Sequence, residues 1–165
     1  MKRSTSSLFF VLFLFLELAT AQPPPALQDP FLDNFVGDWR VERKKGNGQS
    51  VQTSVHVEWV LRHQFIQLHY GSALAATEYE AFVFIGFDAA AKNYVCHWMD
   101  IFGGSFSELG LGKIDEKLPA IEFRFGDDLT NKFTFDGQTK TWTSLVRQTE
   151  KGEWKTFTEE KWTKR

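Results

Sequence analysis

The sequence of 165 residues predicts an all-β fold: a single up-and-down antiparallel β-barrel of about ten strands, with a short helical plug near the N-terminus. Many short segments alternate apolar and polar side chains, as strands with one buried face do. Short turns join nearly all of them, and no long helical crossover intervenes. An open sheet of such strands has two edges with unpaired backbone groups, and closure into a barrel pairs them. A sandwich of two sheets is the alternative, but its Greek-key connections need longer crossing segments than this chain has.

The first 21 residues have the pattern of a secretory signal peptide. Lys2 and Arg3 precede the apolar run 8–16, and Ala19 and Ala21 supply the small residues of a cleavage site. A membrane anchor would need a run of ~20 apolar residues, and this run is shorter. We therefore expect cleavage near Ala21, a mature protein that is secreted or periplasmic, and no membrane association after cleavage.

Residues 22–30 contain consecutive prolines and are expected to form an extended Pro-rich linker. The barrel domain is expected over residues 31–165. At its start Phe31 and Phe35 have near-helical spacing, and an aspartate followed by proline suits a cap and the first helical position. We expect about one helical turn here, with the two Phe rings closing one end of the sheet.

The first strand, residues 37–43, alternates cleanly, and the second is expected to turn Trp59 and Leu61 inward. All strands after the first are expected at residues 51–61, 64–70, 79–87, 94–101, 106–114, 121–125, 129–135, 141–148 and 153–164. The fourth and fifth form a hairpin with apolar residues on both faces, which places it inside the sheet. Gly110 and Gly112 in the sixth are typical of a bend or a bulge.

Composition and charge exclude several partners and kinds of site. The formal net charge is -2 and no segment concentrates basic residues, so neither nucleic acid nor an anionic membrane surface is expected as a partner. Cys96 is the single cysteine, which excludes an internal disulfide and favours a packed, inert thiol. The histidines are scattered without a converging set of ligands, so no metal and no other cofactor is expected. Nothing in the sequence indicates an oligomeric state.

Several motifs occur in an order that is similar to a known group of proteins. They are Gly37-x-Trp39 on the first strand, then Ile85-Gly86-Phe87-Asp88, Tyr94, Trp98-x-Asp100 and Gly103, and finally Glu159, Trp162, Lys164 and Arg165. This combination resembles the calycin superfamily, which gathers lipocalins and fatty-acid-binding proteins. In particular it resembles a bacterial family of uncharacterised secreted lipocalin-like domains, over about residues 31–165.

The resemblance implies a calycin-type barrel, often exported, for which no agreed biochemical activity exists. It also implies a basic residue near the end of the barrel that packs across Trp39, and the candidates are Lys161, Lys164 and Arg165. The chain departs from the haem-binding nitrobindin relatives, whose iron ligand is a His in the C-terminal part, because no His follows His97. Haem ligation of that type is therefore not expected.

The inward side chains suit a mainly hydrophobic pocket with a few orienting hydroxyl groups. The residues predicted to line a ligand site are Trp59, Leu68, Tyr70, Trp98, Asp100, Phe123, Phe125 and Trp142. The leading hypothesis is an exported, non-enzymatic barrel that binds a small hydrophobic or amphipathic ligand in its interior. The same composition would also suit a solid core, because sequence does not distinguish filled from enclosed volume.

Two alternatives stay open. The first is a lipocalin-like isomerase or cyclase, in which Asp100, Tyr70 or Tyr79 moves a proton inside the barrel. Asp100 is the only carboxylate proposed for that role, and its other reading is a cap on the turn at Gly103 and Gly104. The second is a protein-interaction module with a solid core that works through outer charges such as Asp38, Arg40 and Glu42.

Overall fold

The computed structural model describes residues 22–71, 79–115 and 117–165. The predicted signal peptide lies outside the described residues. Within those three ranges, no helix has the length and apolar character needed to cross a membrane.

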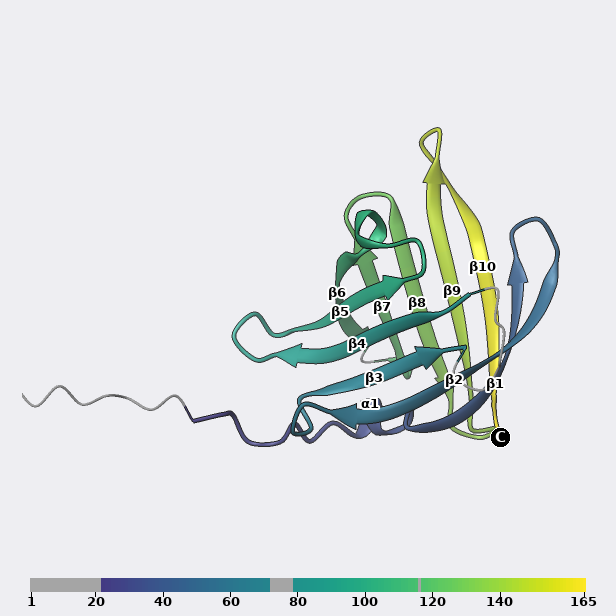
Figure 1. Ribbon diagram of the computed structural model, residues 1–165. Coiled ribbons are helices and arrows are strands. Elements are labelled where there is room, and N and C mark those ends of the chain that lie inside the picture. The colour runs from purple at the N-terminus through teal and green to yellow at the C-terminus, as the bar shows by residue number, and fades with distance from the viewer. Residues whose placement is uncertain (1–21, 72–78, 116) are drawn as a thin grey trace, which may run out of the picture.

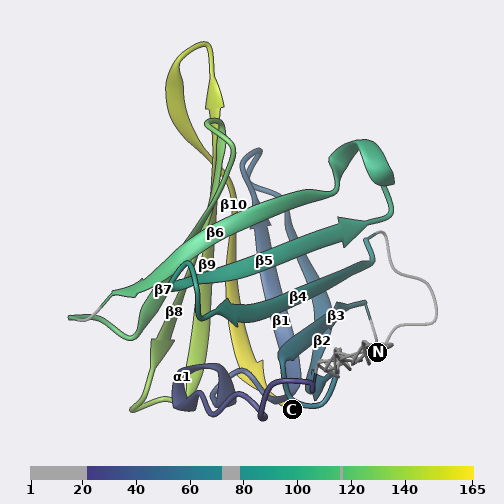
Figure 2. The ribbon, with the colours of Figure 1, turned by 90° about the vertical axis from the view of Figure 1, so that its left-hand side faces the viewer.

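Within the described residues, ten strands form one closed antiparallel barrel (Figures 1 and 2). They are β1 (Gly37–Lys45), β2 (Ser50–Val60), β3 (Phe65–Tyr70), β4 (Ala81–Asp88), β5 (Asn93–Asp100), β6 (Glu108–Asp115), β7 (Ala120–Phe125), β8 (Leu129–Asp136), β9 (Thr141–Glu150) and β10 (Glu153–Lys164). A helix, α1 (Pro30–Asp33), precedes them, and a 3-10 turn, η1 (Gly104–Phe106), lies between β5 and β6. Each strand pairs with its sequence neighbours, and β1 pairs with β10, so the predicted up-and-down barrel is confirmed.

Closure brings the last strand beside the first. Trp39 pairs with Lys164 at one end of this strand pair, and Lys45 pairs with Thr158 at the other. Lys164 Nζ lies 4.1 Å from the centroid of the Trp39 ring and donates a hydrogen bond to the Val36 carbonyl oxygen at 2.5 Å. Partial burial lowers the pKa of Lys164. Of the three basic candidates, Lys164 therefore packs across the first-strand tryptophan.

The helix begins at Pro30 because Asp29 caps it. One oxygen of the Asp29 carboxylate accepts hydrogen bonds from the backbone N–H groups of Phe31 and Leu32, both at 3.0 Å. The other oxygen accepts a hydrogen bond from the Tyr94 hydroxyl at 2.6 Å, which ties the cap to β5. The predicted single helical turn is confirmed.

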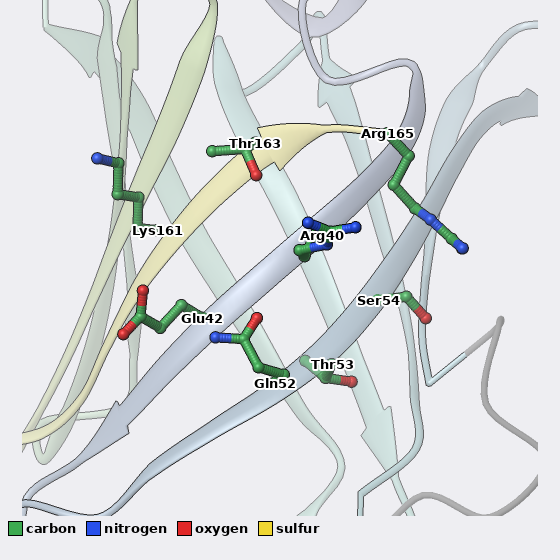
Figure 3. A pocket seen from close by; sticks show the side chains of 8 residues that line it. All are labelled: Arg40, Glu42, Gln52, Thr53, Ser54, Lys161, Thr163 and Arg165. Atoms are coloured by element: carbon green, nitrogen blue, oxygen red, sulfur yellow. The ribbon is translucent and has the colours of Figure 1, made fainter.

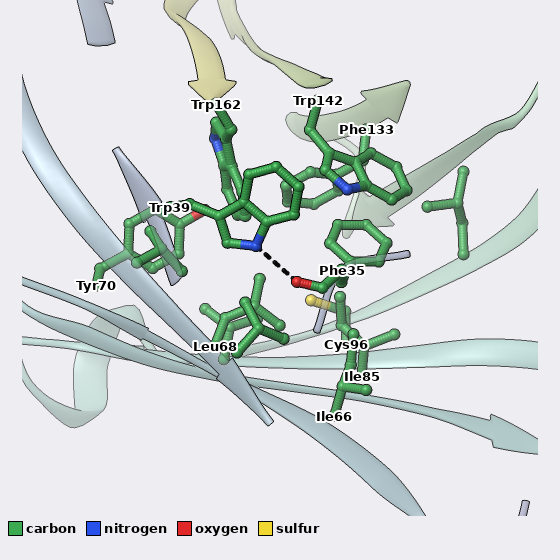
Figure 4. Packing of buried hydrophobic residues seen from close by; sticks show 14 of the residues in the cluster. Phe35, Trp39, Ile66, Leu68, Tyr70, Ile85, Cys96, Phe133, Trp142 and Trp162 are labelled. Atoms are coloured by element: carbon green, nitrogen blue, oxygen red, sulfur yellow. Dashed lines mark hydrogen bonds between the residues drawn. The ribbon is translucent and has the colours of Figure 1, made fainter. Parts of the chain in front are cut away.

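The plug after α1 is an aromatic stack (Figure 4). Phe35 stacks on Trp142 with ring centroids 3.6 Å apart, and Phe31 meets the same indole edge-on at 5.5 Å. Trp39 Nε1 donates a hydrogen bond to the Phe35 carbonyl oxygen at 2.6 Å. The two phenylalanines therefore close this end of the barrel, as predicted.

The turn between β2 and β3 corrects one inward assignment. Leu61, Arg62 and His63 have φ angles of 51°, 57° and 64°, a left-handed run that ends the strand at Val60. Leu61 is 66% exposed, so its predicted inward position is wrong.

The Pro-rich segment lies against this turn. Leu27 N–H donates to the His63 carbonyl oxygen at 2.9 Å, and His63 Nδ1 lies 2.7 Å from the Leu27 carbonyl oxygen. Gln64 Nε2 also donates to the Pro25 carbonyl oxygen at 2.8 Å. From Pro25 onward this segment is therefore docked on the barrel.

The glycines of β6 give room to aromatic rings on β7. A Cβ atom on Gly110 would lie 2.7 Å from the Phe125 ring, and one on Gly112 would lie 2.9 Å from the Phe123 ring. Pairing through both glycines is continuous, so the expected bulge is not there. The register shift occurs in β10 at Phe157, between Thr156 and Thr158.

Candidate functional site

The barrel interior has two ends with different chemistry. α1 lies at the end where β1 begins and β10 finishes, which we call the α1 end (Figures 1 and 2). The far end is the opposite one, where β1 finishes at Lys45 and β5 at Asp100. Between the ends lies a layer of fully buried rings, in which Trp162 contacts Trp39 on the α1 side and Tyr70 on the far side, so side chains fill the middle of the barrel. Buried polar residues on β8, β9 and β10 lie beyond this layer, toward the far end: Asn131, Ser144, Thr158 and Glu160.

β1 and β10 carry a buried ion pair in the far half of the barrel. Arg43 Nε and Nη2 each lie 2.6 Å from Oε1 of Glu160, the residue that faces Arg43 in the strand register. Glu160 Oε2 accepts a hydrogen bond from Trp162 Nε1 at 2.8 Å. The two charged side chains are 11% and 3% exposed. Burial alone would lower the pKa of Arg43, but Glu160 and the neighbouring tyrosines outweigh it, and the pKa is raised.

Arg43 also contacts the aromatic rings of the neighbouring wall. Its guanidinium carbon lies 5.4 Å from the centroid of Tyr70 and 4.6 Å from that of Tyr79. Both distances are in the range of cation–π contacts. Tyr70 ends β3 and Tyr79 precedes β4, so the Arg43 side chain extends from β1 toward these two strands.

A short chain of hydrogen bonds connects the far-end side chains of β5. Trp98 Nε1 donates to the Tyr79 hydroxyl at 2.9 Å, and that hydroxyl donates to Asp100 Oδ2 at 3.1 Å. Burial raises the pKa of Tyr79, so its hydroxyl keeps the proton that it donates. Trp98 and Tyr79 remain half-buried, so this chain reaches the solvent.

Asp100 also holds the following turn. Its Oδ1 accepts a hydrogen bond from Phe102 N–H at 3.0 Å, and its carbonyl oxygen accepts one from Gly103 N–H at 3.0 Å. The predicted capping role is confirmed. Because both carboxylate oxygens already accept hydrogen bonds, Asp100 is held in place by Tyr79 on one side and by the turn on the other.

The Tyr70 hydroxyl is different from its neighbours. Tyr70 is fully buried, and its hydroxyl oxygen has no hydrogen-bond partner in the described chain. The ring lies 5.4 Å from Trp98 and 6.2 Å from Tyr79, measured between centroids. Burial raises the pKa of Tyr70 well above its usual value, so the group is a neutral donor. A buried hydroxyl without a partner is rare in folded proteins, so the Tyr70 hydroxyl requires an explanation.

The structure brings together three of the eight predicted site residues at the far end: Tyr70, Trp98 and Asp100. Leu68, Phe123 and Phe125 belong to the buried core below and beside them.

Trp59 and Trp142 lie at the α1 end instead. Trp59 Nε1 donates a hydrogen bond to Asp33 at 2.9 Å, and Trp142 Nε1 donates to the Asn34 carbonyl oxygen at 3.1 Å. These two residues therefore hold the plug and do not contact Trp98.

Sequence reasoning missed Arg43 and Glu160, because it selected apolar inward residues. The signal was present in the alternation. Arg43 lies two residues after the inward Val41, and Glu160 lies two residues before the inward Trp162. Assigning every second residue to the inward face, charged residues included, would have identified both members of the pair.

The cysteine and the histidines do not form a site. Cys96 is buried, and burial raises the pKa of its thiol, which confirms the packed reading. His56 pairs with Asp38 at 2.8 Å and His69 with Glu80 at 3.1 Å, each on its own part of the surface. Among the described residues, no group of three His, Cys, Asp or Glu side chains could hold a metal ion.

A groove of about 610 Å³ lies on the outer face of β1, β2 and β10 (Figure 3). It is lined by Arg40, Glu42, Gln52, Thr53, Ser54, Lys161, Thr163 and Arg165. Arg40, Lys161 and Arg165 contribute positive charge, against Glu42 in the lining and the nearby Asp38. The groove is polar and open, unlike the barrel interior.

Comparison with known proteins gives a family and no activity. Residues 25–164 match a family described as a protein of unknown function, DUF1579. The chain belongs to this family. Its match includes the docked Pro-rich segment from Pro25, α1 and all ten described strands. The closed ten-stranded barrel fits a calycin-like fold. A search of curated proteins finds no match.

Proposed function

We propose that this DUF1579 protein binds a small, mainly apolar molecule in the interior of its barrel at the far end, without chemical conversion. The observation that carries the proposal is the asymmetry of the interior. Aromatic rings close the α1 end, whereas the far end has half-buried Trp98 and Tyr79 beside buried polar groups. A mostly apolar pocket with a few fixed polar groups is the usual form of a small-molecule site.

The apolar body of such a ligand would contact Trp98 and Leu129, which are inward and half-buried. The rigid floor under it would be the filled layer of Tyr70 and Trp162. Because that floor is already packed, we place the ligand in the far half only, and it does not run through the length of the barrel. We further propose that the barrel is a calycin, and that the protein is exported and carries its ligand outside the cytoplasm.

The test is fluorescence and native mass spectrometry. The protein purified from its own host is examined for a co-purified species, and is then titrated with fatty acids and aromatic dyes. A Trp98→Phe variant should lose most of the ligand-dependent change in tryptophan emission. Trp154→Phe is the matched control, because Trp154 lies on the outer face beside Arg124 and Arg147 and its loss should leave the response unchanged. Absence of both a co-purified species and a fluorescence response would overturn the proposal.

The outer groove supports a second candidate function, an interaction module that binds an acidic segment of a partner protein. Arg40, Lys161 and Arg165 form no ion pair with any residue of the described chain. Reversal of charge in Arg40→Glu with Lys161→Glu should abolish binding of acidic peptides, measured by surface plasmon resonance. Retained binding would contradict it, and Lys155→Glu, in an exposed pair with Glu150, is the control.

A further inference from the structure

In the far-end cluster every carboxylate oxygen already has a donor, whereas some donors have no acceptor among the described residues. Glu160 uses both oxygens, one for Arg43 and one for Trp162. Asp100 also uses both, one for the Phe102 N–H group and one for the Tyr79 hydroxyl. Every carboxylate oxygen of the cluster therefore already has at least one donor within the protein.

Two hydrogen-bond donors of the cluster, by contrast, are available to a ligand. The Tyr70 hydroxyl has a proton and no acceptor among the described residues, although it is fully buried. The ion pair engages Nε and Nη2 of Arg43 and leaves the protons of Nη1 for another acceptor. Arg43 lies over the Tyr70 ring, so both donors belong to one place in the barrel. A ligand that complements them supplies an acceptor.

The charges of the cluster decide what kind of acceptor fits. Arg43 is neutralised by Glu160, and Asp100 adds a further carboxylate on the Trp98 side. An anionic group here would be buried next to two carboxylates, which low-dielectric surroundings make unfavourable. A cationic group would compete with Arg43, which already occupies the faces of Tyr70 and Tyr79. An uncharged acceptor has neither disadvantage.

We infer that the molecule bound at the far end is uncharged and apolar and carries a hydrogen-bond acceptor of the carbonyl class, which the Tyr70 hydroxyl and Arg43 hold. This inference rests on the proposed function and specifies its ligand. The carbonyl oxygen would accept hydrogen bonds from the Tyr70 hydroxyl and from Arg43 Nη1, while the apolar body packs against Trp98. The fatty-acid class, with its carboxylate, is predicted to be a poor ligand.

The test is calorimetric titration of the full chain at neutral pH with probes of nearly equal shape. They are methyl naphthyl ketone, ethylnaphthalene, naphthoate and naphthylmethylammonium. One added neutral hydrogen bond should make the ketone bind roughly tenfold more tightly than ethylnaphthalene. Both charged probes should bind more weakly than the ketone.

Two single-hydroxyl variants locate the effect. Tyr70→Phe should remove the roughly tenfold advantage of the ketone and leave the affinity for ethylnaphthalene unchanged. It deletes a hydroxyl that has no partner, so the variant should fold as well as the parent protein. Tyr94→Phe makes the same chemical change at the α1 end, where the hydroxyl bonds Asp29, and should keep the ketone preference.

The outcomes separate the inference from the function on which it rests. If naphthoate binds most tightly, or if all four probes bind alike, the inference is wrong and interior binding stands. If Tyr70→Phe keeps the full ketone preference, Tyr70 is not the donor. If no probe binds to the parent protein, the proposed function fails and the inference fails with it.

Discussion

The two ends of the barrel interior are built from the same strands and are filled differently. At the α1 end, stacked rings fill the space, and the indole N–H groups of Trp39 and Trp142 bond to backbone carbonyl oxygens next to α1. At the far end, Arg43, Glu160 and Tyr79 bond to one another or to side chains near them. Apolar packing of the first kind stabilises a fold directly, whereas a buried ion pair is weak evidence of stability. We infer that the α1 end maintains the fold, and the binding that we propose lies at the far end.

The sharpest way to break this comparison is to remove one tryptophan from each end. Trp142→Ala deletes a fully buried ring stacked on Phe35 and should lower the free energy of unfolding by about 4 kcal/mol. Trp98→Ala removes a half-buried ring and should cost about 1–2 kcal/mol. Urea unfolding measured by circular dichroism gives both values. Equal losses at the two ends would contradict the assignment of stability to the α1 end.

The ion pair gives the next largest effect. Glu160→Leu leaves Arg43 largely buried without its partner and should destabilise the fold by about 3 kcal/mol. Removing both charges in Arg43→Met with Glu160→Leu should recover much of that loss, because no uncompensated charge remains. Glu150→Leu, in an exposed pair with Lys155, is the control and should change nothing measurable. A double variant no more stable than the single one would show that the pair is not the cause.

The tyrosines at the two ends should make the stability of the fold depend on pH. All three have raised pKa values, mainly because of burial, with a hydrogen bond to Asp29 adding to the shift for Tyr94. Stability should therefore be complete below the ordinary pKa of about 10 and fall as the pH rises above it, because only the unfolded chain ionises readily. At about pH 11, Tyr70 and Tyr79 together should cost roughly 2 kcal/mol.

Urea unfolding at about pH 8 and about pH 11 measures this loss. Tyr70→Phe at the far end should remove more of it than Tyr94→Phe at the α1 end, because Tyr94 is less buried. A phenolate absorbance that appears at pH 10 in the folded protein would contradict the shifts.

The smallest effect is expected at Lys164. Lys164→Met keeps the length of the side chain and removes the charge over Trp39 and the bond to the Val36 carbonyl oxygen. We expect a loss of about 0.5–1 kcal/mol in the free energy of unfolding and a shift in tryptophan emission. Lys161→Met, on the outer face, should produce neither change.

The fold could be predicted from the sequence because most strands alternate, and turns such as Asp136-Gly137 separate the strands. The aromatic plug followed from the spacing of Phe31 and Phe35 beside a capping aspartate. In both cases the pattern is local, so neighbouring residues are enough to see it. Leu61 was misplaced because the alternation continues to residue 61, whereas the backbone turns left-handed at 61–63 and contacts Leu27, which is distant in sequence.

The candidate site could be predicted only in part, for the same reason. Alternation placed Tyr70 and Trp98 on the inward face but gave no position along the barrel axis. The pairing of β1 with β10 decides that Arg43 meets Glu160, and this pairing joins the two ends of the domain. Trp59 and Trp142 were grouped with Trp98 because their residue types agree, although they lie near the end of β2 and the start of β9, where they bond to Asp33 and Asn34.

The glycines on β6 have a consequence for the shape of the cylinder. A slip of β7 by two residues would keep every side chain on its proper face, so alternation alone does not forbid it. Such a slip would move Phe123 opposite Ile114 in one direction, or Phe125 opposite Glu108 in the other, and neither position offers a ring the space that Gly110 and Gly112 do. The absence of side chains at Gly110 and Gly112 thus fixes the register of β7 against β6. The stagger of strand register around a barrel is linked to the tilt of its strands and to its diameter, so the two glycines contribute to both.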